Sequence, residues 1–170
     1  WPLAVHYADS EQWTKALPLL ELLVEGMPAG SDPEALAGAY QRIGQCAEAL
    51  YDVDRALDAF QNAERLATPN LATLDGLARI HFKRRAYGEA EGYLQRIVQD
   101  HRADLSDDAF VDVSMRLGEC ARNLGDHARA RTYLDRVIEA QPDNAAAIKQ
   151  MFEVLEGHGD YADAVTFRRR

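Results

Sequence analysis

A six-residue pattern recurs within the chain and constrains its fold more than any other feature. Residues 42–47 read RIGQCA, and residues 116–121 read RLGECA, 74 residues later. Repetition at the length of a helix pair is typical of a helical solenoid, in which each repeat buries one face against its neighbours. Such folds present long surfaces for binding, so the sequence predicts a binding protein without specifying its partner.

A second pattern, a bulky residue followed three positions later by alanine, marks the expected second helix of each repeat. It begins at Trp13, Val53, Tyr87, His127 and Tyr161, with spacings of 40, 34, 40 and 34 residues. A large residue follows the alanine by four positions, at Leu20, Phe60, Leu94 and Leu134. Together these positions form the apolar stripe of a packed helix.

A first helix is expected in front of each second helix. Its packing face is predicted to comprise, repeat by repeat, Tyr40, Ile43, Gly44 and Ala47; Leu74, Leu77, Ala78 and His81; Ser114, Leu117, Gly118 and Ala121; and Ile148, Met151, Phe152 and Leu155. Glycine costs a helix about 1 kcal/mol relative to alanine. Its use at Gly44 and Gly118 therefore indicates close approach of a neighbouring helix.

Short polar segments mark the expected helix ends. Gly125-Asp126 and Gly159-Asp160 predict a glycine that ends one helix and an aspartate that caps the next. Residues 31–34 (SDPE) predict a capping box with proline in the first turn. Residues 141–144 (QPDN) predict the end of one helix and the start of another.

These features resemble the tetratricopeptide-repeat (TPR) family. The large–Leu–Gly–small pattern of the family's first helix is similar to the residues around Gly44 and Gly118, and residues 159–164 (GDYADA) match its Gly-Asp-Tyr-x-x-Ala turn. Pro142 stands at the family's closing proline, whereas Ala78 and Phe152 depart from its glycine. The resemblance implies an all-α, right-handed TPR-type α-solenoid of antiparallel helix pairs.

We expect one array over residues 1–170. Its about five repeats are predicted at about 1–30 (truncated), 33–68, 70–103, 107–142 and 144–170 (truncated). The alternating spacing makes a 74-residue double repeat, with additional residues near 26–32 and 100–107. Duplication of a two-repeat block explains this, and an added contact surface on one edge is the functional alternative.

Charge and hydropathy exclude several classes of partner. The net charge of −9 argues against nucleic acid, which requires a basic surface, and residues 83–85 (KRR) suit a helix C-terminus. No apolar run approaches the roughly 18–20 residues that span a bilayer. Trp1 is not a natural start, which indicates a mature or excised fragment. No polar helix that would cap the array is recognisable, so we expect that the native protein continues or that a neighbour covers the exposed end. Cytoplasmic location is the default, and the alanine- and arginine-rich style resembles bacterial members of the family.

The chain shows no pattern of catalytic or metal-ligating residues. Cys46 and Cys120 occupy the same repeat position, two repeats apart, and are predicted to be buried hydrophobes. The five histidines, at positions 6, 81, 101, 127 and 158, lack ligand spacing. Residues 104–108 (DLSDD) lack the pattern of a calcium loop and are assigned to helix capping. We therefore expect neither enzyme activity nor a cofactor.

The resemblance implies that first helices line a concave groove. On each first helix, the face next to the packing face is not required for contacts between helices and is available for a ligand. Its residues are Gln41, Arg42, Gln45, Asp75, Arg79, Phe82, Lys83, Met115, Arg116, Glu119, Arg122, Asn123 and Lys149, with Gln150 and Glu153 beside them. Arginine suits bidentate capture of carboxylates, and Phe82 and Met115 are candidate apolar anchors. The expected ligand is a peptide with acidic groups between apolar ones. In the alternative, Asp75, Asp112, Glu119 and Glu153 neutralise the arginines within the array.

Some family members bind chaperone C-termini through a two-carboxylate clamp of lysine, asparagine and arginine. At the matching positions stand Gln41, Gln45, Gly76, Asp112 and Arg116, so the clamp is absent. The predicted function is a non-catalytic scaffold for protein–protein interaction. The alternatives are a regulatory or substrate-recruiting segment of a larger enzyme or secretion machine, and self-association of the chain.

Overall fold

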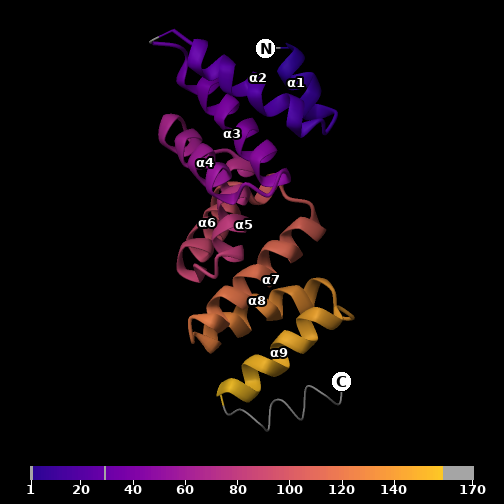
Figure 1. The fold of residues 1–170 in the computed structure, drawn as a ribbon. Helices are drawn as coiled ribbons and strands as arrows, with labels where there is room; N and C mark the ends of the chain where they lie inside the picture. Colours follow the sequence, from indigo (N-terminus) through magenta and orange to yellow (C-terminus); the bar gives the residue numbers. More distant parts are fainter. Residues whose placement is uncertain (1, 29, 159–170) are drawn as a thin grey trace. The chain divides into compact units, whose positions relative to one another are not determined.

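The fold of the described residues is entirely helical. The computed structural model describes residues 2–28 and 30–158, and contains no strand within them. Its helices are α1 (Pro2–Asp9), α2 (Trp13–Gly26), α3 (Pro33–Ala49), α4 (Val53–Leu66), α5 (Leu71–Lys83), α6 (Tyr87–Asp100), α7 (Asp107–Asn123), α8 (His127–Ala140) and α9 (Ala145–His158) (Figure 1). A short 3-10 helix, η1 (Arg102–Asp104), follows α6. The prediction of an all-α fold is confirmed.

The predicted starts of the second helices are confirmed in four repeats. α2, α4, α6 and α8 begin at Trp13, Val53, Tyr87 and His127. The fifth pattern, at Tyr161, and the turn at Gly159-Asp160 lie outside the described residues. None of the described helices is both long and apolar enough to cross a membrane.

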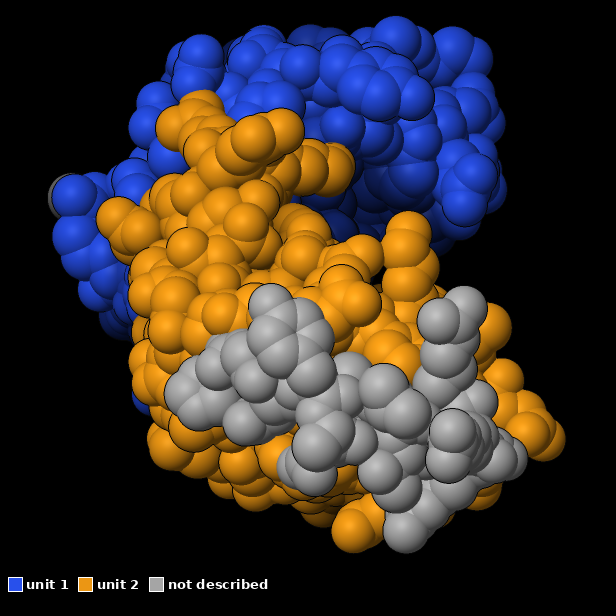
Figure 2. Space-filling view, turned by 90° about the horizontal axis from the view of Figure 1, so that it is seen from below, with its two compact units in different colours: residues 1–80 blue, residues 81–170 orange. Residues whose placement is uncertain are grey.

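The chain forms two compact units, residues 1–80 and 81–170, coloured separately in Figure 2. In the first unit, α2, α3 and α4 pack around a core that includes Leu20, Ile43 and Cys46. In the second unit, α7, α8 and α9 pack around Leu134 and Met151. The first core therefore joins two second helices, α2 and α4, through α3, and the second core lies where α8 packs against α7 and α9.

Glycines permit the closest helix contacts. A Cβ atom built on Gly44 would lie 2.8 Å from the Phe60 ring, and one built on Gly76 would lie 2.5 Å from the same ring. Phe60 of α4 thus fits against glycines of α3 and α5. At Gly118 the corresponding neighbour is the Leu134 side chain, at 3.1 Å. The expectation of tight packing at Gly44 and Gly118 is confirmed.

The turn from first to second helix contains one left-handed residue in each described repeat. These residues are Glu11, Tyr51, Arg85 and Gly125, with φ values of 56°, 63°, 59° and 79°. Asp52 and Asp126 then cap α4 and α8 by accepting hydrogen bonds from the backbone N–H groups of Arg55 and Arg129. α2 and α6 begin after Gln12 and Ala86, which make no side-chain cap. Capping therefore alternates along the chain.

The predicted capping box at residues 31–34 is wrong in its geometry. Asp32, not Ser31, is the N-cap of α3, and its carboxylate accepts from the Glu34 N–H at 3.3 Å. The Ser31 hydroxyl instead donates to the Pro28 carbonyl at 2.8 Å. Pro33 does occupy the first turn, as expected.

The longer spacing within each double repeat has two structural sources. The linkers before α3 and α7, residues 27–32 and 101–106, are longer than those before α5 and α9, residues 67–70 and 141–144. In addition, α3 and α7 each have 17 residues, whereas α5 has 13. Most of the additional residues therefore lengthen a first helix.

Candidate functional site

In the first unit, the predicted binding residues of α3 and α5 are tied to other parts of that unit. Gln41 accepts a hydrogen bond from the Asn70 side-chain amide at 2.6 Å. Arg42 pairs with Asp9 at 3.1 Å, and Arg79 pairs with both Asp75 and Glu48. Two of the predicted arginines therefore join successive first helices, α1 to α3 and α3 to α5.

In the second unit, the arginines of α7 also have carboxylate partners. Arg116 pairs with Asp112, one turn earlier on the same helix, at 2.7 Å. Arg122 pairs with Glu153 of α9 at 2.5 Å. Glu119 accepts a hydrogen bond from Asn123 through its backbone carbonyl. Of the four carboxylates expected to neutralise arginines, Asp75, Asp112 and Glu153 are thus seen to do so.

The two predicted apolar anchors make contacts within the second unit. Phe82 lies edge-on to Tyr87, with 5.8 Å between ring centroids. Met115 is half-buried and packs beside the cores that contain Val111 and Leu134. The side chains of Phe82 and Met115 are partly exposed, and Lys83 and Lys149 are exposed. Gln45 is half-buried on α3.

Glu48 belongs to this constellation, although sequence reasoning missed it. Its side chain is 13% exposed, and it accepts hydrogen bonds from Arg79 at 3.1 Å and 2.8 Å. Comparison of residues 74 positions apart in the sequence could have identified this pair. Glu48 and Arg79 correspond to Arg122 and Glu153, so opposite charges stand at the two positions in both blocks.

Cys46 and Cys120 are free and buried, as predicted. Burial raises the pKa of Cys46 to about 11 and that of Cys120 to about 12. A thiol with so high a pKa is protonated near neutral pH and is a poor nucleophile. The described residues also contain no cluster of His, Cys, Asp and Glu able to hold a metal ion.

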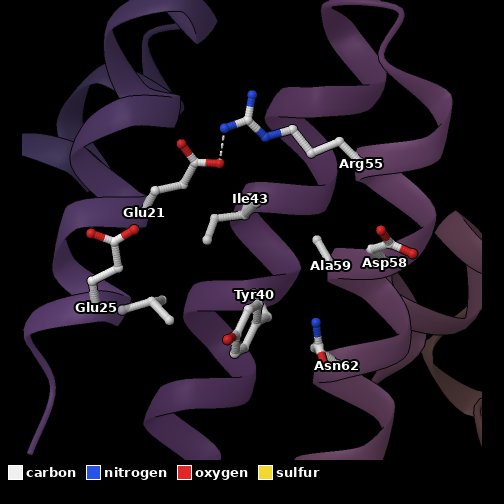
Figure 3. A pocket seen from close by; sticks show the side chains of 9 residues that line it. Glu21, Glu25, Tyr40, Ile43, Arg55, Asp58, Ala59 and Asn62 are labelled. Atoms are coloured by element: carbon white, nitrogen blue, oxygen red, sulfur yellow. Dashed lines mark hydrogen bonds and ion pairs between the residues drawn. The ribbon is translucent and has the colours of Figure 1, made fainter.

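A pocket of about 330 Å³ lies in the first unit among α2, α3 and α4 (Figure 3). Its lining comprises Glu21, Val24, Glu25, Tyr40, Ile43, Arg55, Asp58, Ala59 and Asn62. The second helices α2 and α4 form its two sides, and α3 forms its floor. Sequence reasoning, directed at the first helices, did not identify it.

Comparisons with known proteins agree with this architecture. The tetratricopeptide-repeat family model matches residues 76–145. The crystal structure of YrrB, described as a TPR protein with an unusual peptide-binding site, has a TM-score of 0.81 and 22% identity, covering 96% of this chain and 78% of YrrB. An AMB-1 form of MamA has a TM-score of 0.81 and 16% identity, covering 99% of this chain and 85% of MamA.

A sequence relative comes from Arabidopsis thaliana. Its Protein CTR9 homolog is 30% identical over 105 residues, which are 62% of this chain. The chain spans about 9% of the length of that relative. The helix-pair architecture and the similarity to TPR structures lead to one conclusion: the chain has a TPR-type α-solenoid fold, and its residues 76–145 match the tetratricopeptide-repeat family.

Proposed function

We propose that the chain is a non-catalytic scaffold that binds a segment of another protein along the exposed side of its first helices. One observation carries the proposal: arginines whose side chains are partly exposed recur on α3, α5 and α7. The exposed fractions of the side chains are 33% for Arg42, 38% for Arg79 and 30% for Arg122. YrrB, which shares the fold, is described as having a peptide-binding site.

The internal ion pairs leave these arginines able to bind a ligand. A guanidinium has five N–H donors, and one carboxylate engages only some of them. Asp9 and Asp112, the partners of Arg42 and Arg116, are 62% and 66% exposed. Exposed pairs of this kind contribute about 0–1 kcal/mol, so a ligand carboxylate exchanges with them at little cost. The preferred segment carries acidic groups beside apolar ones, which contact Phe82 and Met115.

Selection from a random peptide library displayed on phage, with the 170-residue chain as bait, tests this function. We expect acidic sequences with apolar residues to be enriched. Their affinity should fall at least about tenfold in a chain carrying Arg42→Glu and Arg116→Glu, because each lost charge-assisted hydrogen bond contributes about 1.5–3 kcal/mol.

The matched control is Arg131→Glu, which reverses one exposed charge on the second helix α8. It should leave the affinity of the selected peptides unchanged. If the double variant keeps its helical circular dichroism and its melting temperature but binds these peptides as well as the original chain, the first-helix surface is not the binding site.

A second function is favoured by the Arabidopsis comparison, in which the matching region is a small part of a much longer protein. There the array would recruit a substrate or partner for a larger enzyme or machine. The coding sequence on either side of this chain distinguishes the two: a catalytic domain in the same polypeptide favours recruitment, and its absence favours the independent scaffold.

A further inference from the structure

The pocket among α2, α3 and α4 carries more negative than positive charge. Glu21, Glu25 and Asp58 line it together with one cation, Arg55. Arg55 of α4 reaches across to Glu21 of α2, and this ion pair occupies one end of the pocket (Figure 3). Glu25 lies one helical turn beyond Glu21, and Asp58 lies one turn beyond Arg55. No ion pair joins these two carboxylates to a cation of the described residues.

The remaining lining is apolar or neutral and suits the stem of a long side chain. Tyr40 and Ile43 of α3 form the floor (Figure 3), and Val24 of α2 and Ala59 of α4 also line the pocket. Asn62 adds an amide beside Asp58 on α4. The volume of about 330 Å³ is at the lower end of ligand pockets, and it therefore suits one side chain better than a large ligand.

The second unit shows what fills the corresponding space 74 residues later. Tyr133 stands where the first unit has Ala59, and its hydroxyl accepts a hydrogen bond from Gln95 of α6 at 3.2 Å. The tyrosine side chain therefore spans the distance from α8 to α6. Arg136, which corresponds to Asn62, lies over the Tyr133 ring at 5.9 Å. In this unit an aromatic ring and a guanidinium therefore stand at the positions that Ala59 and Asn62 have in the first unit.

The acidic residues are also specific to the first unit. Glu21, Glu25 and Asp58 correspond to Gln95, Gln99 and Thr132 in the second unit. Where the chain supplies its own arginine, the carboxylates are replaced by neutral residues. Where it leaves a cavity, the carboxylates are present. The three carboxylates therefore occur in the unit that has the small Ala59, and neutral residues replace them in the unit that has Tyr133.

We propose that this pocket binds an arginine side chain presented by a partner protein. Its guanidinium lies between Glu25 of α2 and Asp58 of α4, and its aliphatic stem lies along Tyr40 and Ile43. The internal Arg55–Glu21 pair shows that a guanidinium bridges these two helices one turn away. Arginine is favoured over lysine because its planar group donates to two carboxylates at once and packs on an aromatic ring. This site is separate from the first-helix surface.

Titration of the ¹⁵N-labelled chain with the blocked peptide acetyl-Gly-Arg-Gly-amide tests the proposal. Saturable shifts are expected at the amides of Tyr40, Ile43 and Ala59. Glu25→Gln combined with Asp58→Thr gives the first unit the residues of the second, at two exposed positions. We expect about tenfold weaker binding, because a charge-assisted hydrogen bond is lost on each side of the pocket.

Four comparisons make the result specific. A peptide with citrulline in place of arginine should not bind, and one with lysine should bind more weakly. Glu139→Gln with Asp143→Asn removes two exposed charges from the second unit and should leave the affinity unchanged. Arg116→Glu should also leave it unchanged, which separates this site from the proposed first-helix site.

Filling the cavity is an independent test. Ala59→Tyr introduces the aromatic residue that the second unit carries, and it should abolish the amide shifts. If this variant does not fold, the affinity of the Glu25→Gln, Asp58→Thr chain tests the proposal. The proposal is overturned by an absence of saturable shifts, by shifts that lie outside the pocket, by equal binding of the citrulline or lysine peptide, or by unchanged affinity in the Glu25→Gln, Asp58→Thr chain.

Discussion

Arg79 on α5 donates two hydrogen bonds to the carboxylate of Glu48 on α3, from Nε at 3.1 Å and from Nη2 at 2.8 Å. The same contact recurs between α7 and α9 with its charges exchanged, since Arg122 there pairs with Glu153. Asp75, the other partner of Arg79, corresponds to Lys149. All three charges are therefore reversed between blocks, and the attraction between neighbouring first helices is retained.

Reversing one of these charges should destabilise the chain, and reversing all three should not. Arg79→Glu places a third carboxylate beside Glu48 and Asp75, and we expect the free energy of unfolding to fall by about 1–2 kcal/mol, a moderate value because Arg79 is partly exposed. Adding Glu48→Arg and Asp75→Lys should restore most of the loss. Urea denaturation measures both effects. If the triple variant were no more stable than Arg79→Glu, the exchanged charges would not be equivalent to the original ones.

Enlarging Gly76 should disturb the packing of Phe60. An added Cβ would lie 2.5 Å from a ring that is fully buried, so we expect Gly76→Ala to cost about 1–3 kcal/mol. Phe60→Leu, which copies Leu134 of the second unit, should reduce the cost of Gly76→Ala in a double-mutant cycle.

Gly92 provides the matched control for this substitution. It lies within α6, is exposed, and has no atom within 4 Å of an added Cβ. Gly92→Ala should therefore stabilise the chain by about 0.5–1 kcal/mol through helix propensity. Thermal melts of the two alanine variants should shift in opposite directions, and equal shifts would refute the role of the Phe60 contact.

The left-handed turn at Tyr51 should accept glycine with a gain in stability. Tyr51 has φ of 63° and is 91% exposed, so its side chain contributes little packing. A non-glycine residue in this conformation costs roughly 1–2 kcal/mol, part of which glycine loses again through its flexibility when unfolded. We expect Tyr51→Gly to gain about 0.5–1 kcal/mol. Gly125→Ala, at the corresponding position, should lose a similar amount.

The buried thiols should make stability fall at high pH. Burial raises the pKa of Cys46 from 9.0 to about 11, so above pH 9 the unfolded chain releases this proton while the folded chain keeps it. Cys120, with a pKa of about 12 in the folded chain, adds to the effect. The free energy of unfolding should therefore decrease as pH rises from 9 to 11, by up to about 1.4 kcal/mol per pH unit for each thiol.

Removing the thiols checks that assignment. In a chain carrying Cys46→Ala and Cys120→Ala, the decrease of stability between pH 9 and pH 11 should be smaller, even though the cavities left behind lower stability at every pH. The same alkaline slope in both chains would show that other groups cause it. Thiol reagents at neutral pH should label the original chain only at the rate at which it unfolds.

The helices were predictable because their signals are local. The bulky-x-x-Ala pattern identified the starts of α2, α4, α6 and α8, since it combines helical period with close packing within one repeat. The cap of α3 was assigned wrongly because Ser31 and Asp32 are adjacent candidates, and only the structure shows the Ser31 hydroxyl bonded to Pro28. Positions on a single helix were therefore easier to predict than the choice between neighbouring caps.

The candidate sites were harder to predict because they depend on neighbouring helices. Counting positions around one helix placed Arg79 correctly on a partly exposed face, but its partner Glu48 lies 31 positions earlier on another helix. The pocket is lined by the small residue Ala59, where the second 74-residue block has Tyr133. The sequence shows this exchange, but it does not show that the exchanged residue lines a pocket. Whether the first-helix residues bind a ligand stays a prediction.

The alternation of capped and uncapped second helices has a consequence for motion. At α2 and α6 the first backbone amides receive no side-chain acceptor from Gln12 or Ala86, whereas Asp52 and Asp126 supply one at α4 and α8. Opening of a first turn is therefore easier in every other repeat. Hydrogen–deuterium exchange should show faster solvent access at the starts of α2 and α6, so the 74-residue unit seen in the sequence would reappear as a periodicity in local opening rates.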